Sequence, residues 1–141
     1  MLRSLFRLAW SAAAVIGGIV VIQAVLLLSA ATWASSWLGA GIPDSAPGLT
    51  VLLALELVAG ILGAFVAVLA APGRPALHAL VFAAAVTALD AAIVFAPGSS
   101  WPLWPGVAVV ATVPLMTWIG YRLALVPRRR RPPHRITGEI A

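Results

Sequence analysis

The sequence predicts an all-α integral membrane protein whose four helices form an antiparallel, up-and-down bundle. Two observations carry this prediction. Hydrophobic residues make up 62% of the 141-residue chain and charged residues only 9%, whereas a soluble domain carries roughly 25% charged residues. The apolar residues also fall into runs of about 20 residues or more, the length that a helix needs to cross the hydrocarbon core of a bilayer. We therefore expect lipid to surround most of the chain.

Each predicted helix is one apolar run, and each break between runs contains turn-forming residues. The first run carries no charge between Arg7 and Asp44, and a loop rich in glycine and proline follows it. Pro72-Gly73-Arg74-Pro75 separates the second run from the third, and so short a connection requires an antiparallel hairpin. Proline, glycine and serine at 97–100 precede the last run. The helices are predicted at about 8–30, 49–71, 75–96 and 103–126.

Together these helices form one predicted transmembrane domain, residues 1–126. The remaining residues, 127–141, are basic and contain proline, so we expect a disordered cytoplasmic tail. The basic start of the chain also suits a secretory signal, but its apolar run is longer than the usual 7–15 residues, and we expect it to be retained. Four successive arginines of the tail are expected to contact the headgroups of anionic lipid: Arg128, Arg129, Arg130 and Arg131.

The placement of arginine predicts the orientation in the membrane. Arg3 and Arg7 precede the first helix, Arg74 lies in the hairpin, and a run of arginines follows the last helix. The other two loops contain no arginine. By the positive-inside rule, both termini are therefore cytoplasmic. The chain also lacks Lys and Asn, whose codons are rich in adenine. This absence indicates a GC-rich bacterial genome, and we expect a multi-pass protein of the bacterial inner membrane.

Several classes of function are excluded by composition. The chain has no cysteine, so it has no thiolate nucleophile and no cysteine-ligated metal. The two histidines, His78 and His134, have no metal-ligand spacing. We find no glycine-rich phosphate loop, nucleophile elbow or catalytic triad. Membrane topology explains the net charge of +5 without nucleic acid. We therefore expect no enzymatic activity, no cofactor, no metal and no nucleic-acid partner.

Small residues at helical spacing predict where helices approach one another. Helices in lipid associate through close packing of small side chains, because lipid is as apolar as the helices themselves. The second and third helices each carry such a stripe, and we expect the two stripes to face each other across the hairpin. Val68 lies off the stripe and is expected to face lipid. The predicted packing residues are Ala59, Gly60, Gly63 and Ala67 on the second helix, with Ala79 and Ala83 on the third.

Two acidic residues inside the predicted spans form the candidate polar site. Glu56 and Asp90 lie equally far along the chain from Gly73, and a helix rises 1.5 Å per residue. Two straight antiparallel helices would therefore hold both carboxyls at one level. Two ionised carboxylates at that depth would repel, so we expect at least one to carry a proton near neutral pH. Three further residues could complete a polar layer: Gln23, Thr87 and Thr112.

The acidic pair leaves two functions open. Glu56 and Asp90 could carry a proton or hold a cation, as intramembrane acids often do. They could also be neutral and join helices by hydrogen bonds, or one could reach the interface by helix tilt. The sequence alone favours a structural or accessory subunit without catalysis. The alternative is a proton- or cation-coupled transporter or channel subunit that acts as an oligomer. The partners expected are anionic lipid and a homo-oligomer or larger membrane complex.

Five short segments of the chain form a recognisable pattern: Ala59 to Ala64, Ala71-Pro72-Gly73, the Pro102-to-Pro105 segment with Trp104, Val113-Pro114-Leu115, and Gly120-Tyr121-Arg122-Leu123. In these segments the chain resembles a group of small, uncharacterised four-span bacterial membrane proteins. The resemblance covers residues 49–125, about two thirds of the chain. It implies a four-span architecture and no activity. Glu56 and Asp90 are not part of the pattern.

Overall fold

The computed structural model describes residues 2–34, 45–99 and 101–129. In these ranges the chain is helical, without strands. The α-helices are α1 (Leu2–Ser29), α3 (Ala46–Leu69), α4 (Pro75–Val94) and α5 (Leu103–Arg129), and a π-helical turn, η1 (Ala30–Ala34), continues α1. All four α-helices are long and apolar enough to cross a membrane, which indicates a multi-pass membrane protein.

The helix ends follow local backbone chemistry. α3 begins at Ala46, before the predicted start, because the Ser45 side chain caps it by accepting a hydrogen bond from the Gly48 N–H. Pro47 therefore lies in the first helical turn and not in the loop. At the other end α3 stops at Leu69, since the residue before Pro72 is driven out of the helical region.

The connection between α3 and α4 includes one unusual backbone conformation. Arg74 is the N-cap of α4 and is left-handed, with φ 43°. Pro75 then occupies the first turn, where no hydrogen-bonding N–H is needed. Trp10 of α1 reaches this turn, because its Nε1 donates a hydrogen bond of 3.0 Å to the Ala70 carbonyl. The start of the bundle is thus tied to the end of α3.

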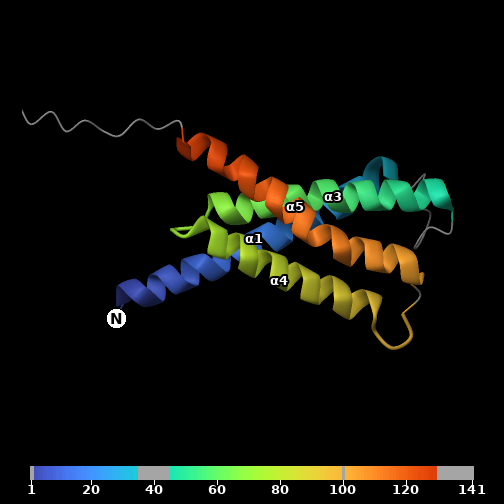
Figure 1. Ribbon diagram of the computed structural model, residues 1–141, viewed down its shortest axis with the longest axis horizontal. Coiled ribbons are helices and arrows are strands. Elements are labelled where there is room, and N and C mark those ends of the chain that lie inside the picture. Colours follow the sequence, from blue (N-terminus) through green and yellow to red (C-terminus); the bar gives the residue numbers. More distant parts are fainter. Residues whose placement is uncertain (1, 35–44, 100, 130–141) are drawn as a thin grey trace, which may run out of the picture.

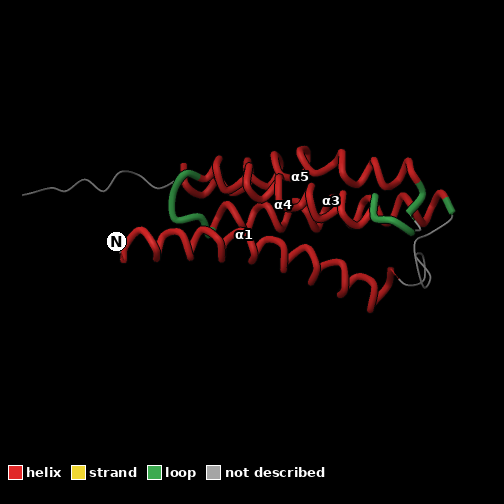
Figure 2. The backbone as a smooth tube through the Cα atoms, turned by 90° about the horizontal axis from the view of Figure 1, so that it is seen from below, coloured by secondary structure: helices red, strands yellow, loops and turns green. Residues whose placement is uncertain are grey.

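Successive helices run in opposite directions along one long axis. The start of α1, the turn at residues 70–74 and the end of α5 lie at one end, and the connection that begins at residue 95 lies at the other (Figure 1). α1 lies along one side of the other three helices (Figure 2). It also has the smallest share of buried residues.

The close helix contacts are made through glycines, and they correct the predicted pairing of the stripes. Gly63 of α3 faces Gly18 of α1, and a Cβ added to either would lie 2.6 Å from the other's carbonyl oxygen. Ala67 also faces Gly18, whereas Gly60 faces Met116 of α5. α3 packs far more extensively against α5 and α1 than against α4. The sequence had predicted that the small-residue stripe of α3 would pack against α4 in the hairpin. The glycines of the stripe instead pack against α1 and α5.

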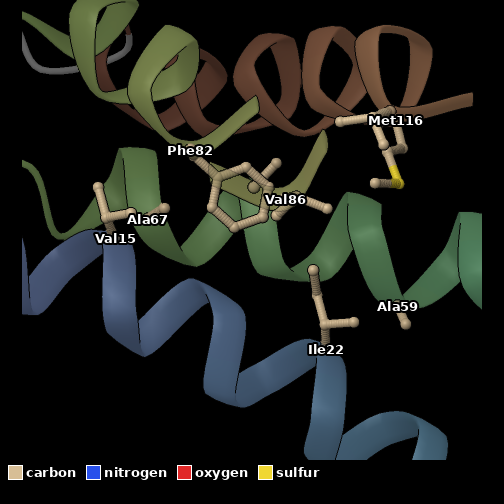
Figure 3. Packing of buried hydrophobic residues seen from close by; sticks show 9 residues of the cluster. Val15, Ile22, Ala59, Ala67, Phe82, Val86 and Met116 are labelled. Carbon is tan, nitrogen blue, oxygen red and sulfur yellow. The ribbon is translucent and has the colours of Figure 1, made fainter. Parts of the chain in front are cut away.

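Phe82 gives the physical reason for this difference. α4 contains no glycine, and it directs the fully buried Phe82 ring into the centre of the bundle, beside α1 and α3 (Figure 3). The ring reaches Gly18, since a Cβ there would lie 2.9 Å from the Phe82 ring. A large side chain between two helices keeps their backbones apart. Glycine allows the closer approach elsewhere.

The other predicted packing residues are buried or partly buried, whereas the prediction for Val68 was wrong. Ala59, Gly60, Gly63, Ala67 and Ala79 are buried, and Ala83 is partly buried. Val68 was expected to face lipid, but it is fully buried in a small cluster with Ala79 and Ala124. Val68 is buried because the side of α3 that meets α5 and the start of α4 extends beyond the small-residue stripe.

The last helix is longer than predicted. α5 continues through Pro127 to Arg129, so the first residues of the predicted tail are helical. Its apolar span ends at Val126. Residues 130–141, with most of the predicted tail, lie outside the described residues, as do the side chains of Arg128, Arg129, Arg130 and Arg131.

Candidate functional site

A cavity of about 240 Å³ brings together three of the predicted polar residues. Gln23 of α1, Glu56 of α3 and Asp90 of α4 all line it. They come from three helices and lie far apart in the sequence. The helical rise that predicted a common level for Glu56 and Asp90 is the reason that both reach one place.

The two acids share this cavity without a basic neighbour. Both are partly buried, and both line the same cavity. None of the described residues that line the cavity is basic. Arg74 caps α4, and the Arg122 guanidinium lies 5.5 Å from the centre of the Trp118 ring. A positive charge for this pair must therefore come from a proton or from outside the described residues.

Aliphatic side chains form most of the cavity wall. Eight Val, Leu and Ile residues from α1, α4 and α5 line it, together with Trp101. Trp101 lies in the connection between α4 and α5 and is partly buried. No pattern in the sequence indicated that Trp101 would lie beside the acids.

The mouth of the cavity opens on the side of the bundle. Gln23, Leu89 and Ile93 line the cavity and are exposed, with 48% of Leu89 and 58% of Ile93 accessible. These residues belong to α1 and α4, whose outer faces would contact lipid in a bilayer. The cavity therefore communicates with the lipid-facing surface between α1 and α4.

The other two predicted members of the polar layer lie elsewhere. Thr87 and Thr112 are partly buried and do not line the cavity. The Thr112 hydroxyl donates to the Val109 carbonyl of its own helix at 2.7 Å. This hydrogen bond satisfies the Thr112 hydroxyl within α5, so the hydroxyl does not require Glu56 or Asp90 as a hydrogen-bond partner.

Comparisons with family models, with curated proteins and with solved structures find no match for the chain.

Two buried polar side chains outside the cavity were not predicted as sites. His78 is 8% exposed, and its Nδ1 lies 3.2 Å from the Arg74 carbonyl oxygen. Its Nε2 and the Thr117 hydroxyl are buried and lack a hydrogen-bond partner among the described residues. Among those residues no group of three or more His, Cys, Asp or Glu could hold a metal ion. His78 lies at the start of α4 and Thr117 within α5.

The arrangement can neutralise one positive charge inside the membrane. Two carboxyls can share a proton or hold a cation between them, and Gln23 can both donate and accept a hydrogen bond. This chemistry is the binding and release of a proton or cation.

Proposed function

We propose that this chain is a subunit of a proton- or cation-coupled transporter or channel, and that Glu56 and Asp90 bind the coupling charge. The observation that carries the proposal is the single cavity that both acids line. Acids inside a span are costly to keep in lipid, and a shared cavity without a base leaves them available for a proton or cation.

The proposal places the protein in a bacterial inner membrane with both termini in the cytoplasm. The alternation of arginine-containing and arginine-free connections supports this orientation. Arg128, Arg129, Arg130 and Arg131 would then meet the anionic headgroups of the inner leaflet. The likeness of residues 49–125 to small four-span bacterial proteins is part of the same proposal. No catalytic activity and no cofactor are included in it.

Self-association is also part of the proposal. Among the described residues, three polar side chains line the cavity, one each from α1, α3 and α4. A pathway across the bilayer needs polar groups along its length, and four short helices do not enclose one. Copies of the chain would supply the remaining wall.

An accessory subunit is the competing function, and the sequence alone favoured it. The same cavity supports it, since a pair of neutral, hydrogen-bonded acids needs no pathway. In that function the acids only hold helices together. Replacing them by amides would then preserve the protein's role and its stability.

Ion flux in reconstituted vesicles separates the two functions. Wild-type protein in liposomes with an internal pH-sensitive dye should dissipate an imposed proton or potassium gradient. Glu56→Gln and Asp90→Asn keep the side-chain shape and remove the charge, so each should abolish the flux while the circular dichroism spectrum is retained. Asp44→Asn, an acid outside the apolar spans, is the matched control and should leave the flux unchanged.

Two results would overturn the transport proposal. One is a wild-type protein that passes no ion under any gradient, together with amide variants of unchanged or higher melting temperature. The other is flux that survives in both amide variants. Either result would leave the accessory function.

A further inference from the structure

The walls of the acidic cavity indicate which cation it accepts. Only Gln23, Glu56 and Asp90 bring side-chain oxygen atoms to it, whereas the other nine described lining residues are aliphatic or tryptophan. A hard inorganic cation takes six or more oxygen ligands to replace its water. Three side chains in an aliphatic cavity do not supply them. A bare metal ion is therefore a poor match for this composition.

An organic cation matches both parts of the wall. Its charge would lie between Glu56 and Asp90, while its apolar substituents would contact the Val, Leu and Ile side chains, a favourable exchange with water. The Trp101 ring adds a large apolar surface to the wall. An apolar cavity of about 150 Å³ holds a benzene molecule, so a volume of about 240 Å³ has room for a small ring with a charged head.

The position of the mouth agrees with the same ligand. Leu89 and Ile93 are exposed at the mouth on the side of the bundle. A ligand that enters there crosses lipid, which strongly disfavours a small hydrated ion. A cation with apolar substituents partitions into the bilayer and reaches the mouth directly.

We propose that the cavity between α1 and α4 binds a monovalent lipophilic organic cation, with its charged centre at Glu56 and Asp90 and its apolar part against Trp101. The inference rests on the proposed function, because it names the cation that the acid pair takes. The other charged or titratable side chains on the described part of the chain do not line the cavity. These two carboxyls alone are therefore expected to hold the charge of the ligand, while the aliphatic wall and Trp101 contact its apolar part.

Calorimetry with a defined probe tests the inference. The full chain in lipid nanodiscs would be titrated with benzyltrimethylammonium, with its uncharged isostere neopentylbenzene, and with sodium or potassium chloride. Saturable binding is expected for the organic cation alone. Glu56→Gln and Asp90→Asn should each weaken it by about tenfold or more. Trp101→Leu should weaken it by about threefold to tenfold. Asp44→Asn should bind as the wild type does.

Each outcome bears on one of the two proposals. Binding of the isostere with equal affinity, or unchanged binding in both amide variants with normal melting temperatures, would mean partition into lipid and would overturn the inference. Proton or potassium flux without binding of the organic cation would overturn the inference and keep the proposed function. Neither flux nor binding would overturn both. Should Glu56→Gln fail to fold, Asp90→Asn and Trp101→Leu carry the same test.

Discussion

Gly18 of α1 and Gly63 of α3 approach so closely that each occupies the space where the other would place a Cβ. An added Cβ on Gly18 would lie 2.6 Å from the Gly63 carbonyl oxygen, and the reverse distance is also 2.6 Å. Real Cβ atoms essentially never lie this near to a backbone oxygen. This contact joins α1 to the rest of the bundle beside the Phe82 ring.

Gly18→Ala should therefore destabilise the protein by about 1–3 kcal/mol, because the obstacle is backbone and must move as a whole. The neighbouring Gly17 provides a matched control, since a Cβ there would meet nothing within 4 Å. Gly17→Ala should be neutral or slightly stabilising through better helix propensity. Melting temperatures in a mild detergent measure both. Equal melting temperatures for the two variants would show that α1 does not approach α3 at Gly18.

The contact between α3 and α5 predicts a ranking of two further glycines. A Cβ on Gly120 would lie 2.6 Å from the Ile61 carbonyl oxygen and 2.7 Å from the Ala64 Cβ. A Cβ on Gly60 would meet the Met116 side chain, which is flexible and can take another rotamer. Gly120→Ala should therefore lower the melting temperature more than Gly60→Ala. The reverse order would mean that Met116 is held rigidly and that α5 can shift along α3.

The Thr117 hydroxyl predicts a stabilising substitution. Thr117 is 5% exposed, and its oxygen lacks a hydrogen-bond partner in the described part of the chain. Thr117→Val keeps the shape and removes the unsatisfied group, so it should stabilise the protein by about 1 kcal/mol. Thr112→Val is the control, because it removes a hydroxyl that donates to Val109, and it should bring no gain. A lower melting temperature for Thr117→Val would reveal a partner for the hydroxyl in the assembled protein.

Orientation can be measured with single cysteines, because the chain has none of its own. Ser99→Cys should react with a membrane-impermeant maleimide in intact cells. Gly73→Cys, where a Cβ meets nothing within 4 Å, should react only after the membrane is opened. These expectations follow from the arginine of the hairpin and its absence from the opposite connection. A reporter fused after Arg131 should read cytoplasmic. Labelling of Gly73→Cys in intact cells would mean that the hairpin lies outside the cell and that the predicted membrane orientation is inverted.

The candidate site was predictable in part from the sequence. The equal spacing of Glu56 and Asp90 from Gly73 predicted a shared level, since the rise of a helix does not depend on its neighbours. Gln23 also lines the cavity. Trp101 was missed, because its place depends on how the connection after α4 folds back beside α1. Thr87 and Thr112 were grouped with the acids by depth, but a depth alone does not say which side of a helix faces inward.

The sequence by itself determined the number, the class and the approximate ends of the helices. Apolar runs and local signals such as Pro72 and Pro75 act within a few residues, so they are readable without the partners. The tertiary structure decided which faces meet. α3 carries small residues toward more than one neighbour, and only the positions of Gly18 on α1 and Gly120 on α5 select those helices for close approach. The bulk of Phe82 then sets α4 further from α3, because packing depends on the shapes of both surfaces at once.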